Sequence, residues 1–522
     1  MGNKKQATAS TVPLQGGVNT RVDDVQIPFG GFSTAQNVRP RHPGFIKRPG
    51  QRALHTSADS TNKVRTLFQF RKQKVDEKHL FAQMSDDDVL GPATTAPPGV
   101  TTGVFGPEAF SGSTGTKPAS WATSKDLMFY SNGVDAHQVY GGNTSYVDRC
   151  VVYKGTATIP NVPEEGFDYS DAVHVDDTSK TADFSSLGTD TDNAIMVGLP
   201  VPIKSLTFDL VTFNDNAITM TISYRKNDNT WADTSNSDGT DVGGDTLKQD
   251  GTCAWTMPSD EIPFYAYGQS LYWYRITFSG ALDASVSCNT ITWDTDWQAF
   301  DNLWDGVTVN PVEVWTEKAA DDKWSVYHSS SVTLDSLGID QKILLFCTDP
   351  IEAVYIDVGK NPTTAATTLT DVRYWDGDSW NSSSSEADGT SGMSNSGWIT
   401  FARESTVQPL QFQGSLFYSY VYELTFGTAM PATMEVSFSV APYFDISELG
   451  NGYSNGVWKG RMCYSFDQWP NFVYVSTNFL PMTLNGDDFG LLEAGDGRTN
   501  KIAGMRSLYN ELVVWQEEKG LE

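Results

Sequence analysis

Several features that mark enzymes and membrane proteins are missing from this chain. No apolar stretch approaches the roughly 18 residues that a membrane-spanning helix requires. The fingerprints of nucleotide-binding loops, zinc proteases and nucleophile elbows do not occur. The six histidines show neither metal-ligand nor i,i+4 spacing. These absences predict a protein that is not an enzyme, that has no membrane span, and that uses no cofactor.

Cysteine is scarce and scattered. No Cys-x-x-Cys pair occurs, so a zinc site of that type is not expected. Single cysteines in strand-like surroundings predict buried thiols in a protein made in a reducing cytoplasm. The N-terminus also lacks the apolar segment of a signal peptide, which favours cytoplasmic synthesis. The five cysteines are Cys150, Cys253, Cys288, Cys347 and Cys463.

Three acidic segments remain as candidates for a metal site. Residues 85–90 (SDDDVL), 189–193 (TDTDN) and 227–229 (NDN) carry oxygen ligands of the kind that Ca²⁺ prefers. None has the spacing and terminal Glu of an EF-hand loop. Solvated loops explain these segments better, so we predict no metal site.

Turn formers and strand formers are abundant. The chain has 522 residues, which is too long for one ordinary core, so three or four domains are expected. Thr, Ser, Val and aromatic residues are common, and Gly, Asn and Asp recur at short intervals. This composition predicts an all-β protein with many tight turns.

A long internal repeat is the clearest signal in the sequence. Residues 221–282 and 371–430 share a Tyr, an Asp-Gly-Thr turn, and a closing aromatic strand in the same order. Tyr224 leads Asp238 by 14 positions, and Tyr374 leads Asp388 by 14 positions. A repeat of this length predicts a duplicated folding unit, since each copy needs its own core. The repeated Asp-Gly dipeptide is better explained as a turn than as a metal ligand.

The segments that flank the repeat resemble each other. Strands are predicted at 64–70 and 79–84, and a pair of strands at 119–140 around a type I′-like Asn132-Gly133 turn. Short strands return after the repeat, so the twin modules look inserted between two like segments. The later strands are predicted within 456–466, 472–477, 501–510 and 511–517.

The last residues follow directly on a predicted strand. Nothing after that strand could cap a sheet edge, although exposed edges normally have to be protected. We therefore expect either that the chain is a fragment of a longer protein or that a neighbouring chain completes the fold.

Charge is distributed unevenly along the chain. Residues 1–80 hold 14 Lys+Arg against 5 Asp+Glu, a net charge of +9. The remaining residues hold 36 − 14 = 22 Lys+Arg against 64 − 5 = 59 Asp+Glu, a net charge of −37. The acidic charge of these residues should repel nucleic acid. It could simply keep the protein soluble, or it could form a surface along which DNA slides without adhering. The basic segment could contact nucleic acid or an acidic neighbouring subunit, and its Pro, Gly and apolar residues favour the subunit.

Residues 16–52 resemble the N-terminal segment of the tail-nozzle proteins of short-tailed bacteriophages, the tail tubular protein B type. Residues 120–142 resemble a propeller-blade signature of that family, and residues 459–485 and 494–520 are similar to its later blades. The twin modules lie outside the resemblance. The matching N-terminal positions are Gly16, Gly17, Asn19, Pro28, Asn37, Val38, Arg48, Pro49 and Gly50.

The resemblance implies a partial β-propeller-like domain, and the internal repeat adds two modules inserted into it. We predict an all-β fold with an extended N-terminal arm, a partial propeller-like domain, and two inserted, duplicated β-sandwich modules. The family's propeller needs more blades than this chain supplies, so a propeller closed within one chain is not expected. The predicted parts are the arm (1–60), a first propeller-like segment (61–159), module 1 (160–310), the connector with module 2 (311–450), and a second propeller-like segment (451–522).

The tryptophans offer a second interpretation of the modules. Eleven of the 15 tryptophans lie between residues 231 and 398. Their repeated positions favour a role in the module cores, because duplicated cores must repeat. If exposed, they could instead stack on host glycans. The candidate glycan platform is Trp231, Trp255, Trp380 and Trp398.

The resemblance implies a structural role in the virion tail. Subunits of such proteins form a ring, commonly a hexamer, that extends the DNA-ejection channel and docks the tail adaptor or portal-proximal proteins and the tail fibres or tip. Viral DNA passes through transiently. We expect the arm to make assembly contacts through Arg21, Arg39, Arg41, Lys47 and Arg48. The alternative is a receptor-binding or decoration protein whose modules bind glycans of the bacterial surface.

Overall fold

The computed structural model describes most of the chain after residue 37. The described residues are 38–41, 44–47, 55–56, 61–75, 78–91, 103–104, 108–142, 145–154, 166–188, 193–226, 230–300, 303–318, 323–334, 337–363, 368–412, 415, 418–431, 433–442, 446, 449–486, 489–495, 500–517 and 520–521.

The fold is all-β. The described residues form 43 strands and one short helix, α1 (Ser170–Val173), and the strands pair almost entirely in antiparallel fashion. The chain divides into two compact units, of which the first holds Met1–Ala58 and Ala93–Phe105. The predicted all-β class is confirmed, and the blade-like sheets do not close into a complete propeller.

The first unit contains two small pairings. Strand β1 (Val38–Arg41) pairs antiparallel with β2 (Gly44–Lys47), and β3 (His55–Thr56) pairs parallel with β7 (Gly103–Val104).

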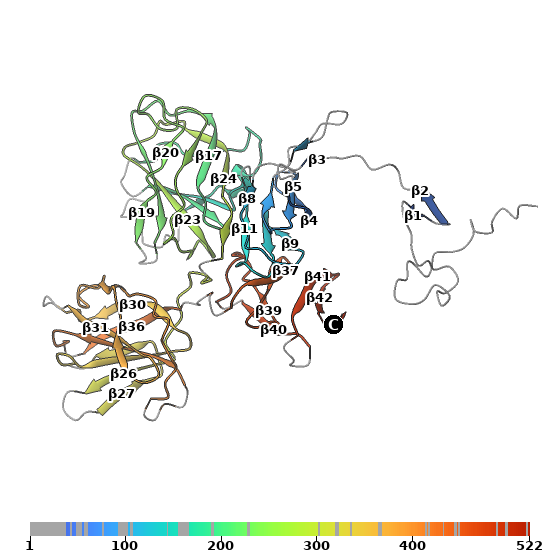
Figure 1. The fold of residues 1–522 in the computed structure, drawn as a ribbon. Helices are drawn as coiled ribbons and strands as arrows, with labels where there is room; N and C mark the ends of the chain where they lie inside the picture. The colour runs from blue at the N-terminus through green and yellow to red at the C-terminus, as the bar shows by residue number, and fades with distance from the viewer. Residues whose placement is uncertain are drawn as a thin grey trace, which may run out of the picture. The chain divides into compact units, whose positions relative to one another are not determined.

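The second unit contains four blade-like antiparallel sheets, whose strands are drawn in blue to cyan and in red in Figure 1, apart from the short β25. Sheet one consists of β4 (Val64–Arg71), β5 (Lys78–Met84), β6 (Val89–Leu90) and β8 (Glu108–Phe110). Sheet two consists of β9 (Ser120–Ser124), β10 (Leu127–Ser131), β11 (Gln138–Tyr140) and β25 (Gln298–Ala299). Sheet three consists of β37 (Gly452–Trp458), β38 (Arg461–Phe466), β39 (Phe472–Val475) and β40 (Gly490–Glu493). Sheet four consists of β41 (Ile502–Leu508), β42 (Glu511–Gln516) and β43 (Gly520–Leu521).

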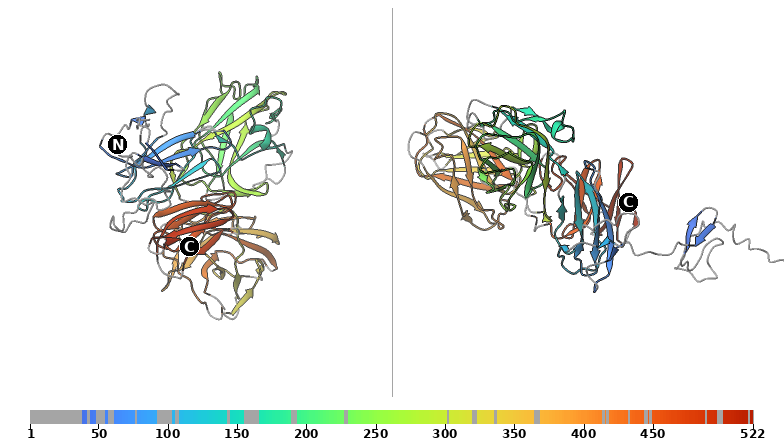
Figure 2. Two further views of the ribbon diagram at one scale, coloured as in Figure 1. Left: turned by 90° about the vertical axis from the view of Figure 1, so that its right-hand side faces the viewer. Right: turned by 90° about the horizontal axis from the view of Figure 1, so that it is seen from above.

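These four sheets pack face to face in succession. The first strands of sheets two, three and four lie next to one another, so β9 contacts β37 and β37 contacts β41, although they are far apart in the sequence (Figure 2). Aromatic side chains fill the spaces between sheets: Phe129 lies 6.1 Å and Phe300 4.8 Å from Tyr464, centroid to centroid. The predicted likeness of the early and late strands therefore reflects sheets that share one stack.

One predicted turn is wrong. Asn132-Gly133 does not form a type I′ hairpin, because only Gly133 has positive φ and the Asn132 side chain accepts hydrogen bonds from the backbone of Val134 and Asp135. The two-residue turn lies between β9 and β10 at Lys125 and Asp126, both of which have positive φ. The side-chain oxygen of Asn132 competes for the local N–H groups, so this segment forms an Asx turn.

Module 1 is a β-sandwich whose strand pairing begins at Ser145, before the expected residue 160. Its first sheet consists of β14 (Phe167–Asp168), β13 (Arg149–Tyr153), β16 (Ala194–Leu199), β23 (Gln269–Phe278), β18 (Met220–Arg225) and β19 (Trp231–Asp233), with β22 (Phe264–Ala266) pairing to β23. Its second sheet consists of β12 (Ser145–Tyr146), β24 (Ser287–Asp294), β17 (Ser205–Thr212), β21 (Gly251–Ala254) and β20 (Ser237–Asp238), with β15 (Ala182–Asp183) pairing to β24.

Module 2 repeats the same strand order. Its first sheet consists of β27 (Lys323–Tyr327), β26 (Glu313–Lys318), β29 (Lys342–Cys347), β35 (Tyr420–Phe426), β31 (Leu369–Trp375) and β32 (Trp380–Ser382). Its second sheet consists of β28 (Ser331–Leu334), β36 (Met434–Pro442), β30 (Ile351–Lys360), β34 (Gly397–Thr400) and β33 (Ala387–Asp388).

The duplication extends to individual hydrogen bonds. The hydroxyl of Tyr274 accepts from the Ile203 amide at 2.9 Å in module 1, and the hydroxyl of Tyr422 accepts from the Ile351 amide at 3.0 Å in module 2. The Asp-Gly-Thr turns are also the same, since Asp238 and Asp388 each accept from the amide two residues on at 2.8 Å. The repeated Asp is thus a turn residue held by its own side chain.

Strand pairing shows which of the four platform tryptophans correspond between the modules. Trp231 and Trp380 occupy the same register, because Trp231 faces Arg225 and Trp380 faces Trp375 across the strand. Asp238 pairs with Cys253 and Asp388 pairs with Ile399, so Cys253 and Ile399 are equivalent positions. Two residues further on, Trp255 is therefore equivalent to Phe401 and not to Trp398.

The five cysteines are buried and free, as predicted from the sequence. Burial raises the pKa of the Cys150 and Cys463 thiols to about 12, because the charged thiolate is poorly solvated there.

Replacing Tyr422 by Phe should destabilise module 2 by about 1–3 kcal/mol, because the buried Ile351 amide loses its hydrogen-bond acceptor. The measurement is urea unfolding followed by tryptophan fluorescence. Tyr418→Phe is the control, since Tyr418 is 72% exposed. Equal unfolding midpoints for the two variants would contradict the assigned role of the Tyr422 hydroxyl.

Candidate functional site

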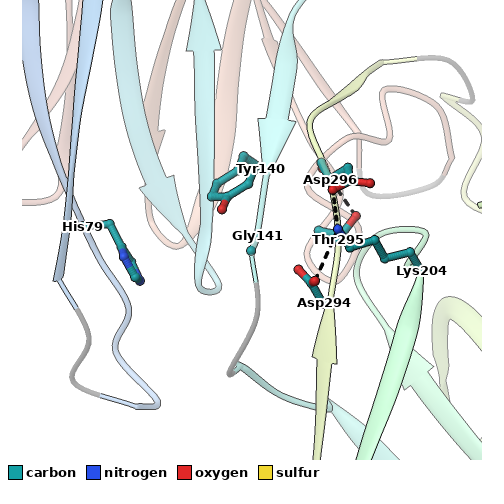
Figure 3. A pocket seen from close by; sticks show the side chains of 8 residues that line it. His79, Tyr140, Gly141, Lys204, Asp294, Thr295 and Asp296 are labelled. Carbon is teal, nitrogen blue, oxygen red and sulfur yellow. Dashed lines mark hydrogen bonds and ion pairs between the residues drawn. The ribbon is translucent and has the colours of Figure 1, made fainter. Parts of the chain in front are cut away.

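A small cavity lies where module 1 joins the blade-like sheets. It has a volume of about 190 Å³, and Figure 3 shows His79 and Tyr140 on one side and Lys204 with two aspartates on the other. Most of the lining comes from the two ends of the insertion, since Gly141 follows β11 and Asp294 ends β24, while His79 comes from β5 and Lys204 precedes β17. The full lining is His79, Tyr140, Gly141, Gly142, Lys204, Asp294, Thr295 and Asp296.

Short polar contacts hold the two ends of the insertion together. The Lys204 ammonium lies 3.3 Å from Asp294 Oδ2 and also pairs with Asp296. The Gly142 amide donates to the Thr295 carbonyl at 3.2 Å. The chain therefore leaves blade-like sheet two and returns to it at one hydrogen-bonded point.

Two glycines are required at this point for steric reasons. A Cβ on Gly141 would stand 2.6 Å from the ring of Trp293, and a Cβ on Gly142 would stand 2.8 Å from the Tyr140 hydroxyl. Gly142 also has a φ of +65°, which side-chain-bearing residues rarely adopt. The close approach of the two chain ends depends on these missing side chains.

The electrostatics of this cavity are those of a structural junction. Burial raises the pKa of the Asp294 carboxyl, and Lys204 partly offsets that effect. Burial lowers the pKa of Lys204, but the bond to Asp296 and the attraction of both aspartates outweigh it, so the net shift is upward. Burial raises the pKa of Tyr140 to about 12. The volume is below the roughly 300–1,000 Å³ of ordinary ligand pockets, which favours a structural role.

His137, the one buried histidine among the described residues, is a packing residue. His137 is fully buried between sheets two and three, and its Nε2 lies 3.1 Å from the Ser465 carbonyl. Burial lowers the pKa of His137 to about 3, so its imidazole is neutral at physiological pH. A neutral ring in an aromatic cluster with Tyr464 and Phe466 contributes packing and one hydrogen bond.

A larger cavity of about 390 Å³ lies on module 1, against the face of its first sheet that is turned away from the sandwich core. The β22–β23 hairpin forms one wall, with Tyr265 and Tyr267, and β13 with the edge strand β14 forms the other. The lining is Arg149, Val151, Gly166, Asp168, Tyr265, Ala266, Tyr267 and Gly268.

This larger cavity contains an ion pair. Arg149 Nη1 lies 2.9 Å from Asp168 Oδ2. Burial raises the pKa of Asp168, but hydrogen bonds from Ser170 and the charge of Arg149 lower it further than that, so the carboxylate is ionised. Burial raises the pKa of Tyr267, which keeps its hydroxyl a donor. Sequence reasoning missed these residues, because Arg149 lies over 100 positions before Tyr265 and only the Tyr267-Gly268 turn gave a local signal.

The four predicted platform tryptophans are buried or half-buried in this structure. Trp255 belongs to the core of module 1 and packs against Tyr274. Trp231 is half-buried beneath the guanidinium of Arg275, 4.7 Å from the ring centroid. They line neither cavity.

The matching pair in module 2 is placed similarly. Trp380 packs edge-on to Trp375 at 5.9 Å, and Trp398 lies 5.2 Å from Tyr355. Both are half-buried, and the four tryptophans do not meet in a common site.

The predicted assembly residues fall partly within the described chain. Arg39 and Arg41 lie on β1, where the register pairs them with Ile46 and Gly44, and Lys47 ends β2. Arg21 and Arg48 lie outside the described residues.

The acidic segment at 85–90 is a structural turn. Asp87 is buried and accepts from Arg65 Nη1 at 2.6 Å as well as from Gln83 and the Gly115 amide. Within the described ranges, no group of three or more His, Cys, Asp or Glu is arranged to hold a metal ion. Of the other two acidic segments, only Asn193 is described, so neither 189–193 nor 227–229 can be placed as a site.

No protein-family model and no curated protein matches the chain. Among solved structures, the N-terminal CBM22-1-CBM22-2 tandem domain of Xyn10C from Paenibacillus barcinonensis aligns at 9% identity over 50% of this chain and 85% of that chain, with a TM-score of 0.15. That score is too low to relate the two folds. No helix among the described residues is long and apolar enough to cross a membrane.

One buried carboxyl in module 1 is not part of either cavity. Glu261 is 6% exposed, and burial raises its pKa to about 8, an effect that the nearby Tyr274 hydroxyl only partly reverses. Its neighbour Ile262 packs with Trp304 and with Ala353 of module 2. Glu261 is therefore protonated when the protein is folded at neutral pH.

Protonated Glu261 should make the stability of module 1 pH-dependent. Its folded-state pKa of about 8 exceeds the ordinary value of 4.5, so stability should fall as pH rises between these values and stay low above the upper one. Glu261→Gln should remove this slope and raise stability at high pH by an amount on the order of a few kcal/mol. Unfolding midpoints at several pH values test this. The exposed control Glu511→Gln should leave the slope unchanged. If Glu261→Gln also leaves the slope unchanged, the prediction is wrong.

Proposed function

We propose that this chain is a ring-forming structural subunit of a bacteriophage tail, a nozzle that extends the DNA-ejection channel. The observation that carries the proposal is the stack of four blade-like sheets whose two outer faces expose apolar side chains. Leu67 lies on sheet one, and Leu508 and Trp515 lie on sheet four. A sheet normally buries its apolar face against another element, so these exposed side chains suggest a contact with a partner.

A second copy of this chain is the partner that fits best. The exposed apolar side chains of sheets one and four lie at opposite ends of one stack, because sheet one packs on sheet two and sheet four packs on sheet three. Contact between the last sheet of one copy and the first sheet of the next is heterologous, and heterologous contacts close into rings when the rotation permits. The subunit number follows from that rotation, and a hexamer is expected from the resemblance.

The resemblance of residues 16–52 to nozzle proteins supports the same proposal. The basic segment of residues 1–80 carries a net charge of +9 beside a remainder at −37, so it is suited to contact an acidic neighbour. In this proposal the arm reaches an adjoining subunit or the tail adaptor. Fibres or a tip protein dock elsewhere on the ring.

The acidic remainder is suited to a channel wall. DNA carries about one negative charge per 1.7 Å of helix axis, so an acidic wall would keep it from adhering during passage. A channel wall that proves positively charged would contradict this electrostatic part of the proposal and leave the structural part standing.

Native mass spectrometry with electron-microscope class averages tests the ring. A ring with a central hole is the expected result, either for the chain alone or after the tail adaptor is added. A monomer or a trimer without a channel under both conditions would contradict the proposal.

Leu508→Asp should shift the assembly toward single subunits, because a buried unpaired carboxylate at the contact is costly. Leu508 is 59% exposed in the single chain. The matched control is Ile339→Asp on module 2, where the side chain is 61% exposed. Both variants should fold, as judged by circular dichroism, and only Leu508→Asp should lose the ring. Equal assembly of both would show that sheet four does not form the contact.

A further inference from the structure

The two modules differ at one place on an otherwise shared face. Strand register makes Cys150 the counterpart of Val314, since Cys150 pairs with Val197 and Val314 with Leu345, and these flank Tyr274 and Tyr422 in the same way. The next residues along β13 and β26 are therefore also counterparts. Arg149 corresponds to Glu313, and Val151 corresponds to Trp315.

In module 2 this place is filled and its polar groups are paired. The Trp315 ring is buried 5.0 Å from Phe346 and 5.5 Å from Phe412. Its indole N–H donates to Glu313 Oε2 at 2.9 Å, and His328 Nδ1 lies 3.3 Å from the other carboxylate oxygen. Large aromatic rings thus occupy the space.

In module 1 the same place is open. Val151 replaces the tryptophan, and it lines the cavity of about 390 Å³. Arg149 pairs with Asp168 through Nη1, but its Nε is buried and has no partner among the described residues, and the same is true of the Tyr267 hydroxyl. Buried donors without acceptors are costly, so this corner of the cavity is less well satisfied than its counterpart in module 2.

The hairpin wall is held in a costly conformation. Tyr267 has a φ of +49° and Gly268 a φ of +78°, so the turn places a bulky aromatic residue in the left-handed region. Asn or Gly would adopt this conformation at lower cost. The conformation holds the Tyr267 ring against the buried Trp273, 5.4 Å away, and Tyr267 lines the cavity. Tyr265, two residues earlier, is 52% exposed.

We propose that this cavity of module 1 binds a neutral sugar residue of a glycan. A sugar hydroxyl both donates and accepts, so it can donate to the Asp168 carboxylate and accept from the Arg149 guanidinium, whose side chain is 24% exposed. The C–H face of a pyranose ring packs on an aromatic ring such as Tyr265. An anionic ligand would face the Asp168 carboxylate and a cationic one the Arg149 guanidinium, so both are disfavoured.

The cavity volume agrees with this ligand class, since ligand sites commonly measure about 300–1,000 Å³. The proposal does not depend on ring formation, because the cavity lies wholly within module 1 and is lined by its own strands and hairpin. Module 2 is not expected to bind sugar at the corresponding place, because Trp315 fills it.

Saturation-transfer NMR on the full chain tests the proposal, with glucose, galactose, mannose, N-acetylglucosamine and galacturonate as probes at millimolar concentration. At least one neutral sugar should receive saturation, and Tyr265→Ala should weaken its binding about tenfold or more. Tyr267→Asn should weaken it as well while keeping an Asn-Gly turn of the favoured type. Phe167→Ala is the matched control, because Phe167 is 59% exposed on β14 beside the cavity but does not line it.

Three outcomes would overturn the proposal. The first is that no neutral sugar receives saturation from the folded chain. The second is that binding survives in both Tyr265→Ala and Tyr267→Asn, each shown to be folded by circular dichroism. The third is that galacturonate alone binds, which would assign the cavity to an acidic ligand.

Discussion

The pairing of β11 with β25 is the constraint on which the arrangement of this chain depends. Only two residue pairs join these strands, Gln138 with Ala299 and Val139 with Gln298, and the whole of module 1 lies between them in the sequence. Closing a loop of that length costs conformational entropy, which is smaller once the module has folded and brought its ends together. Blade-like sheet two therefore receives its last strand, β25, only after the chain has passed through module 1. The contacts of Lys204 with Asp294 and Asp296 hold the chain in place just before that strand.

The fold class could be predicted from the sequence because strands and turns are indicated by residues that are close together in the chain. Turn residues and alternating apolar positions predicted strands at 64–70 and 79–84, and the structure places β4 and β5 there. The repeat predicted two like modules, and Tyr274 and Tyr422 make the same hydrogen bond in each. Asn132-Gly133 misled because the Asn side chain, rather than the dipeptide conformation, organises that turn.

The cavity on module 1 could not be predicted in the same way. Arg149 and Asp168 come from the neighbouring strands β13 and β14, and Tyr265 comes from a hairpin far along the chain, so only the sandwich brings them together. The sequence offered the tryptophans as a glycan platform because aromatic rings stack on sugars, while their repeated positions already favoured a role in the duplicated cores. A residue that differs between the copies, such as Val151 in place of Trp315, is the better indicator of a site. That difference becomes visible only when strand register aligns the modules.

The comparison of the two copies also separates stability from binding. Glu313 in module 2 accepts from Trp315 and lies beside His328, so the face satisfies its own polar groups and excludes a ligand. Arg149 at the corresponding position in module 1 retains a buried donor that no described residue satisfies. One copy of a duplicated unit can hold its packing while the other changes, because each has a separate core. Divergence after duplication thus accounts for why an open, donor-lined cavity exists on one sandwich and a closed aromatic face on its twin.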